Sequence, residues 1–277
     1  MHSTPLKTLL LIIISTAIAI GQATPYTWLD SYDSKQAIIT RIAPPDSFTR
    51  VKTAPGSFGK WLQHLPLKQG NPPIYLHNGE KKNLQEAHCA VVDIDTGTDD
   101  LQQCADAVIR LRAEYLYAIG LHDSIAFNFT SGDLFRYRDW LDGKTPVISH
   151  NKVSWQQQSA RENNRATFHK YLKIIFTYAG SYSLSRELVK VADIDSIQPG
   201  DIFIQGGFPG HAMLVVDVAY KQESGEKIFL LAQSYMPAQD IHIVCLPNGG
   251  PWFAINTDGK LITREWIFNK TDLKRFK

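Results

Sequence analysis

One cysteine and one histidine in this sequence have the residue types that nucleophilic catalysis requires. Cys104 falls near the start of the first long helical pattern, and His211 follows a glycine-rich turn at residues 206–210. A helix N-terminus favours the thiolate, because its unpaired N–H groups and the helix dipole stabilise an anion. A neighbouring imidazole can accept the thiol proton and later protonate a leaving group. The pair therefore indicates hydrolysis through a covalent acyl intermediate.

Gln233 is the candidate for the group that orients the imidazole. A short turn at residues 223–226 joins the strand that His211 opens to the next one, and this hairpin brings Gln233 roughly opposite His211. An amide side chain there completes the logic of nucleophile, base and orienting group. His88 and His242 also lie in strand-like segments and are rival candidates for the base.

Each of these residues also has a purely structural interpretation. Cys104 lies on the apolar stripe of its helix, where a buried, unreactive cysteine is common. His211 can serve as a hydrogen-bonding residue at a strand end, and Gln233 as an ordinary polar strand residue. Spacing alone leaves both interpretations open.

An aromatic and arginine-rich stretch between residues 121 and 155 is a candidate substrate groove. Arg136 and Arg138 offer anion binding, and Trp140 offers a stacking face for sugars or peptides. The glycines Gly206 and Gly207 would let a substrate backbone approach closely. The alternative is a loop packed over the core by its aromatic side chains. A further alternative makes Cys104 a core thiol and the arginine-rich stretch the true site.

The elements that must position these residues follow from hydrophobic periodicity. Residues 88–95 read as a strand. A helix is expected from Thr98-Asp99-Asp100 to about Gly120, which puts Cys104 in about its second turn, and a second helix over roughly 164–178. Strands are expected over 200–205, 211–220 and 228–235, apolar on both faces and so covered on both sides. The predicted fold class is α+β, with a central antiparallel sheet packed on the cysteine-bearing helix.

Residues 1–23 have the layout of a secretory signal peptide. Lys7 precedes the apolar run of residues 9–21, and small residues Gly21 and Ala23 precede the expected cleavage point. A retained membrane anchor is the alternative, although the run is short for a bilayer span. We expect residues 24–277 to form a single α+β domain in the periplasm or outside the cell, with 24–75 as a wrapping arm, 88–277 as the core and no stable membrane anchor.

The composition excludes several classes of protein. Apolar residues make up 44% and charged residues 20% of the chain, as in an ordinary globular fold, and the net charge of +2 gives no reason to expect a nucleic-acid partner. No Cys/His cluster has zinc spacing, so neither a metal nor another cofactor is expected. Three cysteines leave at least one thiol without an intramolecular partner; if Cys89 pairs with Cys245, that thiol is Cys104.

Several long motifs occur in the chain in a fixed order, and they resemble the motifs of two known families. The segments DLQQCADAVIRLRAEYLYAIG, FNFTSGD, GDIFIQGGFPGHAMLVVDVA and FLLAQSYMPAQDIHI closely resemble a secreted bacterial family, domain of unknown function 4846. A second resemblance is to papain-like amidases of the NlpC type, which cleave cell-wall peptides. Those enzymes carry a helix-borne cysteine, a Pro-Gly-Asp strand, a strand opened by histidine and a polar third residue. The matching order here is Cys104, Pro199-Gly200-Asp201, His211 and Gln233.

This resemblance implies a nucleophile at Cys104, a base at His211 and an orienting group at Gln233. The function expected is an exported thiol amidase or peptidase acting on peptidoglycan or another envelope peptide or glycan. The alternative is a non-catalytic envelope module that binds glycan or peptide on the same fold.

Overall fold

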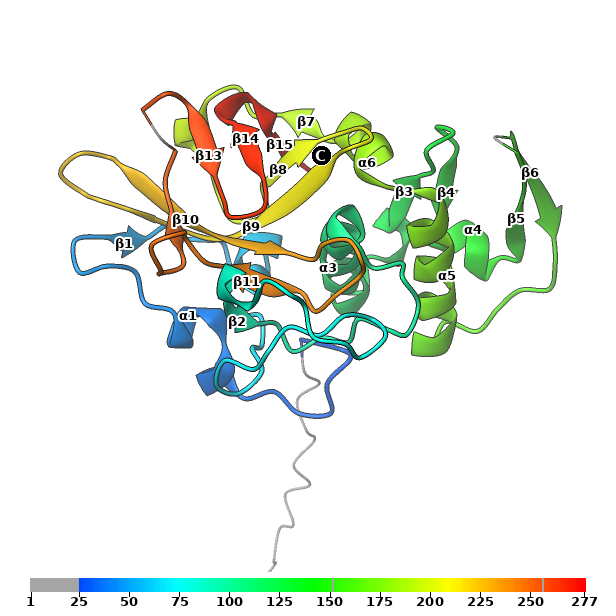
Figure 1. Cartoon of the computed structure of the whole chain (residues 1–277). Coiled ribbons are helices and arrows are strands. Elements are labelled where there is room, and N and C mark those ends of the chain that lie inside the picture. The colour runs from blue at the N-terminus through cyan, green and yellow to red at the C-terminus, as the bar shows by residue number, and fades with distance from the viewer. Residues whose placement is uncertain (1–24, 151, 256) are drawn as a thin grey trace, which may run out of the picture.

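The computed structural model describes residues 25–150, 152–255 and 257–277 (Figure 1). The predicted signal peptide at residues 1–23 lies outside the described residues. Within them, no helix combines the length and the apolar character needed to cross a membrane.

A large antiparallel sheet forms the centre of the molecule, as the α+β prediction requires (Figure 1). Strand β1 adds to β9 and β12 adds to β10 at the side of the main path. In spatial order the main strands are β2 (His88–Val91), β11 (His242–Val244), β10 (Lys227–Gln233), β9 (His211–Tyr220), β8 (Ile202–Gln205), β15 (Leu273–Arg275) and β7 (Val189–Lys190), and the additional strands are β1 (Thr49–Arg50) and β12 (Trp252–Phe253).

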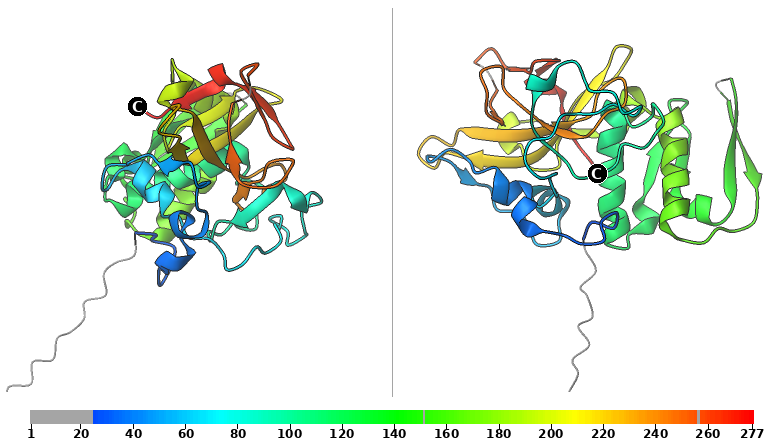
Figure 2. Two further views of the ribbon diagram at one scale, coloured as in Figure 1. Left: turned by 90° about the vertical axis from the view of Figure 1, so that its left-hand side faces the viewer. Right: turned by 60° about the horizontal axis from the view of Figure 1, so that its bottom comes forward.

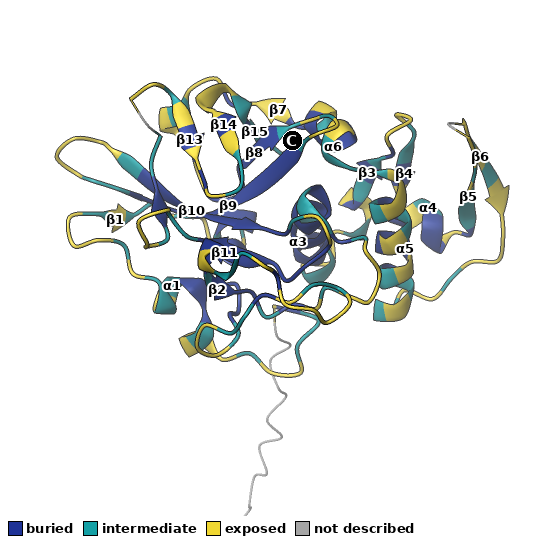
Figure 3. Ribbon diagram, viewed as in Figure 1, coloured by how far each residue is buried: buried dark blue, intermediate teal, exposed yellow. Residues whose placement is uncertain are grey.

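Strand β9 is covered on both faces, as its apolar residues at 212–216 predict. Successive side chains of a strand point to opposite faces, and here they enter two different cores. Leu214 and Val216 belong to the larger hydrophobic cluster, whereas Met213 and Val215 belong to the smaller one. Figure 3 shows β9 and β10 as buried almost throughout.

The helix that carries Cys104 begins later than the sequence indicates. Helix α3 spans Cys104–Ala118, so the prediction of a start near Thr98 and of Cys104 in the second turn is wrong. Residues 99–103 instead form turns, with Leu101 N–H donating to Asp99 O and Gln103 N–H to Leu101 O. Asp106 then caps the helix by accepting a 3.1 Å hydrogen bond from Gln103 N–H. Cys104 is therefore the first residue of the helix.

Five further helices and five short 3-10 turns complete the helical elements of the described residues. Helix α5 (Arg165–Tyr178) agrees with the predicted second helix, and Asn164 caps it by accepting from Thr167 N–H. The remaining helices are α1 (Ile38–Arg41), α2 (Phe58–Gln63), α4 (Tyr137–Leu141) and α6 (Ser181–Glu187), and short 3-10 turns lie at Ser34–Gln36, Gln85–Ala87, His122–Ser124, Ile194–Ser196 and Lys270–Asp272.

The stretch between residues 121 and 155, which lacks periodicity, contains two hairpins. One joins β3 (Ala126–Asn128) to β4 (Leu134–Arg136), and the other joins β5 (Lys144–Ser149) to β6 (Lys152–Gln157). The β5–β6 hairpin lies at the far side of α5 from the central sheet (Figures 1 and 2). A third hairpin, β13 (Lys260–Ile262) with β14 (Ile267–Asn269), lies near the C-terminus.

Residues 25–75 contribute to the main core as well as to the surface. Strand β1 pairs with the end of β9, and Tyr26, Ile38 and Leu62 are fully buried. Tyr26 packs against Trp61 with ring centroids 5.1 Å apart.

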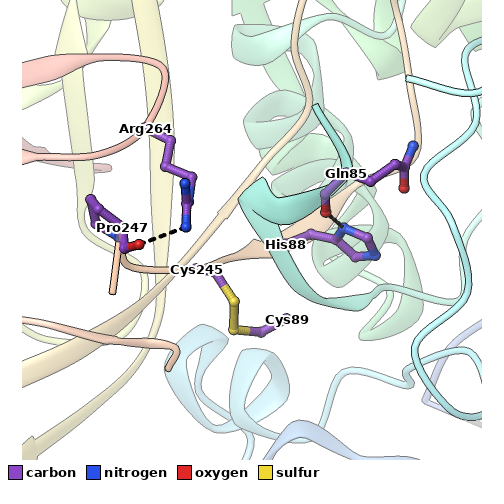
Figure 4. Close-up of a disulfide and its surroundings, with 6 residues drawn as sticks. All are labelled: Gln85, His88, Cys89, Cys245, Pro247 and Arg264. Carbon is purple, nitrogen blue, oxygen red and sulfur yellow. Dashed lines mark hydrogen bonds between the residues drawn. A yellow bond between two sulfur atoms is a disulfide. The ribbon is translucent and has the colours of Figure 1, made fainter. Parts of the chain in front are cut away.

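A disulfide joins Cys89 in β2 to Cys245, which directly follows β11 (Figure 4). Strands β2 and β11 are neighbours, so the bond fastens the edge of the sheet. Cys104 is left as the free thiol.

Candidate active site

Cys104 lies beside the first residues of β9. Helix α3 packs against that strand, and the backbone of Ala212, the residue after His211, acts to lower the pKa of the Cys104 thiol by favouring its thiolate form. The amides of Cys104 and Ala105 in the first turn of α3 also stabilise the thiolate form. The nucleophile candidate is thus set at a helix start, next to the backbone of the strand that His211 opens.

Hydrogen bonds define which nitrogen of His211 carries its proton. Gln233 Nε2 donates to Glu265 Oε2 at 2.7 Å, because a carboxylate can only accept. The other end of the Gln233 amide, Oε1, then faces His211 Nε2 at 2.7 Å and accepts from it. His211 therefore carries its proton on Nε2, and its Nδ1 makes no hydrogen bond within the described part of the chain. That nitrogen is a free base.

A second layer of polar residues fixes the Gln233 amide. Gln233 Nε2 also lies 3.2 Å from His242 Nε2, and His242 Nδ1 lies 2.9 Å from Asp240 O. Glu265 forms an ion pair of 2.6 Å with Lys82, whose side chain is 8% exposed. The amide cannot rotate without breaking these contacts, so the orientation of the His211 ring is fixed.

The two rival histidines do not offer a free ring nitrogen. His88 Nδ1 lies 2.6 Å from Gln85 O and its Nε2 lies 2.9 Å from Pro72 O (Figure 4 draws the Gln85 contact). Both nitrogens of His242 are also engaged, as described above. Of these three histidines, His211 alone has a nitrogen available to act as a base.

Burial keeps both members of the pair uncharged. Burial first, and then the nearby Asp106 carboxyl, raises the pKa of the Cys104 thiol to about 11, although the backbone hydrogen bonds lower it in part. Burial lowers the pKa of His211 to about 4, against the raising effect of its bond to Gln233. The expectation that the helix start lowers the thiol pKa is therefore wrong, because desolvation outweighs it. At neutral pH the site holds a thiol and a neutral imidazole.

Aromatic side chains surround the His211 ring and exclude water from it. The His211 ring lies 4.9 Å from the ring of Tyr235, 5.2 Å from that of Trp266 and 6.0 Å from that of Phe268, measured between centroids. His211 is 2% exposed, whereas Cys104 is half-buried. The base is enclosed, and the nucleophile lies nearer to solvent.

A substitution at Asp106 tests whether its carboxyl contributes to the raised pKa of the Cys104 thiol. Its carboxyl is buried, and burial raises the pKa of that carboxyl well above the ordinary value. Its Oδ1 has no hydrogen-bond partner among the residues that the structure describes. Asp106→Asn keeps an oxygen to accept from Gln103 N–H and removes the acidic group beside the thiol. We expect iodoacetamide to modify Cys104 slowly at pH 7 and faster as the pH rises, with the rise moved to lower pH in this variant.

The measurement is the rate of Cys104 alkylation against pH, followed by mass spectrometry on the folded protein. Asp123→Asn, at an exposed position, is the matched control and should leave the profile unchanged. An unchanged profile in Asp106→Asn would show that this carboxyl has no influence on the thiol.

The structure does not bring Arg136, Arg138 and Trp140 to this pair. Trp140 is 7% exposed, its indole N–H donates to Thr167 O, and the Arg161 guanidinium stacks on it at 3.6 Å. Its face is therefore covered. Arg138 pairs with Asp123 at 2.8 Å, and Arg136 is exposed on β4. Arg136 ends β4, and Arg138 and Trp140 lie on α4; both elements lie on the side of α3 away from the central sheet (Figure 1).

Gly206 and Gly207 lie in the turn between β8 and β9. A Cβ on Gly206 would come within 2.1 Å of Ser185 Oγ, so the missing side chain lets the turn pack against α6. Gly207 adopts a φ of 152°, which favours glycine. Both residues are needed for the turn that presents His211, whether or not a substrate contacts them.

Three residues of the site carry no signal in the sequence that marks them as functional: Glu265, Lys82 and Asp106. Glu265 is 32 residues from Gln233, and Lys82 is 183 residues from Glu265. No spacing rule connects positions so far apart. Within the described residues, no group of three or more His, Cys, Asp or Glu side chains is arranged to hold a metal ion.

Comparison with known proteins gives one match. No curated protein matches the chain, and no solved structure does. A family model described as "Domain of unknown function (4846)" matches residues 38–275, which include Cys104, His211 and Gln233. Because the match covers most of the 277 residues, the chain belongs to this family.

Proposed function

We propose that the protein is a thiol hydrolase that cleaves amide bonds, with Cys104 as nucleophile, His211 as general base and Gln233 as orienting group. The observation that carries the proposal is the hydrogen bond from His211 Nε2 to Gln233 Oε1, because it leaves Nδ1 free as a base. A base with a free nitrogen, on the strand that packs against a helix starting with cysteine, is the arrangement that acyl transfer needs.

The neutral state of the pair determines the mechanism. Cys104 Sγ attacks the carbonyl carbon as its proton passes to His211 Nδ1, and the carbonyl π electrons move to oxygen. The amides of Cys104 and Ala105, at the unpaired start of α3, are the candidates to stabilise that oxyanion. The intermediate collapses, the amine leaves with the proton from His211, and a thioester remains.

Hydrolysis of the thioester completes the cycle. Water attacks the thioester carbonyl and gives one proton to His211. The carbon–sulfur bond then breaks, the proton returns to sulfur, and a carboxylic acid is released. No metal, oxidant or other co-reactant is required for this balance.

The order of elements supports a papain-like enzyme of the NlpC type. A cysteine at the first position of a helix, a strand after Pro199-Gly200-Asp201, and a polar residue on the strand next to His211 follow the pattern of those enzymes. The later helix start strengthens this likeness, because in that pattern the cysteine opens its helix.

The substrate class that we propose is a peptide of the cell envelope. The predicted signal peptide supports an envelope location. Two large apolar residues, Phe208 at 89% and Met236 at 60% exposed, lie close in sequence to His211 and Gln233. They offer contact surface for peptide side chains beside the pair.

The test is to look for the thioester directly. The purified protein is incubated with peptides released from peptidoglycan, quenched in acid, and examined by intact-mass and peptide mass spectrometry. We expect new amine and carboxylate products and a transient acyl adduct on Cys104 that is missing from Cys104→Ala. The absence of both products and adduct at stoichiometric protein over hours would contradict the proposal.

A second candidate is a non-catalytic module that binds envelope peptide or glycan. The observation in its favour is that burial raises the thiol pKa to about 11, as expected for an unreactive core cysteine. Unmodified peptide retained by the protein, with equal retention by Cys104→Ala, would support this second candidate.

A further inference from the structure

A cavity of about 480 Å³ lies away from the Cys104 pair. Its wall comes from residues 51–59, from residues 196–200 before β8, from Arg112 on α3, from Lys227 at the start of β10 and from the C-terminal Arg275 and Phe276. None of Cys104, His211 and Gln233 lines it. Five parts of the chain that are distant in sequence therefore line a space that the proposed hydrolysis does not use.

The charged residues of this wall are all basic. They are Lys52, Arg112, Lys227 and Arg275, and no aspartate or glutamate lines the cavity. Arg275 is neutralised by Asp201, with contacts of 2.5 and 2.9 Å. Lys227 Nζ donates to the carbonyl oxygens of Asp195 and Ile197. Within the described residues, no carboxylate pairs with Lys52, Arg112 or Lys227, so the cavity carries an excess of positive charge.

Arg112 is the central feature of this cavity. Its guanidinium carbon lies 5.1 Å from the ring centroid of Phe58, 5.1 Å from that of Phe276 and 5.6 Å from that of Tyr115. Burial lowers its pKa, and none of its five N–H groups donates to a partner within the described chain. Stacking on aromatic rings compensates in part for the lost hydration but satisfies no N–H donor. A partly desolvated guanidinium that is stacked on aromatic rings and has free N–H donors can bind an anion.

A second cavity adjoins the first at the same arginine. It has a volume of about 240 Å³ and shares Arg112 and Phe276 with the larger one, and Lys277 adds another cation. Glu187 is the acidic residue in its wall, and burial raises the pKa of that carboxyl to about 7. Arg112 therefore lies between two hollows, and a ligand held by it has room on both sides.

We infer that this basic cavity is a binding site for an oxyanion, in which Arg112 is the main anchor and Lys52 and Lys227 add charge. The ligand class is a small molecule that carries a phosphate or carboxylate group, with an apolar part that contacts Phe58 and Phe276. This site is independent of the Cys104 chemistry, so either can be correct without the other.

Calorimetric titration of the full protein with two probes tests the inference, with pyrophosphate for phosphate groups and citrate for carboxylates. We expect saturable one-to-one binding of at least one probe, weakened as salt rises. Binding of pyrophosphate alone identifies phosphate recognition, and binding of citrate alone identifies carboxylate recognition. Binding of both identifies general oxyanion recognition. No saturable binding of either probe would overturn the inference.

Variants separate this site from nonspecific charge effects. Arg112→Met retains an apolar stem for the aromatic rings and should weaken binding by at least about tenfold. Lys52→Gln alters an exposed side chain, does not threaten folding, and should weaken binding severalfold. Arg138→Gln removes an exposed cation elsewhere and should leave the affinity unchanged. Equal affinity in Arg112→Met, Lys52→Gln and the parent protein would contradict the assignment.

Discussion

Replacing Cys104 with alanine should lower the rate of amide hydrolysis by about 10³-fold or more, the scale of loss when an essential nucleophile is removed. The side chain is half-buried at the first position of α3, and alanine is a good helix former. We therefore expect the variant to fold and to keep the Cys89–Cys245 disulfide. The measurement is product formation from peptidoglycan peptides, with circular dichroism as the check on folding.

A large loss of rate is also expected from His211→Ala, and the two losses should not multiply in the double variant. Removing a general base costs about 10²–10⁴-fold in rate. When two residues act in one step, the double variant is no slower than the slower single variant. His150→Asn changes an exposed histidine at the tip of the β5–β6 hairpin and is the matched control. Full activity in either single variant, or multiplied losses in the double variant, would remove the pair from the mechanism.

The central strands and the His211–Gln233 contact could be predicted from the sequence because local signals specify them. The strand prediction of 211–220 coincides with β9, and an apolar run bounded by a glycine-rich turn and a Ser-Gly turn has few other interpretations. A short hairpin then limits which residue of β10 can face His211. Gln233 was found by this route, although a register shift at Leu230 and Leu231 made the exact pairing unpredictable.

The residues that hold the Gln233 amide in place could not be predicted from the sequence, because they come from distant parts of the chain. Glu265 comes from the β13–β14 hairpin region and Lys82 from the segment before β2, and their ion pair has a sequence separation of 183. The start of α3 was misplaced for a local reason. Acidic residues at positions 99 and 100 imitate a helix start, whereas the cap that forms uses Asp106.

The charge state of the site depends on burial, which the sequence does not specify. A cysteine at a helix start is usually taken to have a lowered pKa. Here the desolvation of Cys104 and the enclosure of His211 by aromatic rings reverse that inference. The rings that cause this effect, Tyr235 and Trp266, come from a loop and from the C-terminal region. Only the folded chain brings them to His211.

Removing the disulfide with Cys89→Ala and Cys245→Ala should lower the free energy of unfolding by about 2–5 kcal/mol. The two cysteines are 156 residues apart, so the bond closes a long loop and strongly restricts the unfolded chain. For a protein of this size the loss corresponds to a fall in Tm of roughly 5–15 °C. Guanidinium denaturation of the parent and the double variant measures it. Dithiothreitol should destabilise the parent and leave the variant unaffected.

The location of the disulfide also predicts which strands unfold locally first when it is removed. Strand β2 is at the edge of the sheet, and among the described residues β11 is its one partner strand. Outside the sheet, Lys68 N–H donates to Val91 O at the end of β2. The disulfide is therefore a main attachment of this edge. Hydrogen exchange should therefore increase first in β2 and β11, while β9 stays protected.

The same change should reach the candidate site. Lys82 lies six residues before β2 and forms an ion pair with Glu265, so activity should fall together with the protection of β2 and β11. Uniform loss of protection across the sheet, β9 included, would show that the bond stabilises the whole fold and not its edge. Cys104→Ala, which leaves the disulfide intact, is the control that separates loss of the bond from loss of a cysteine.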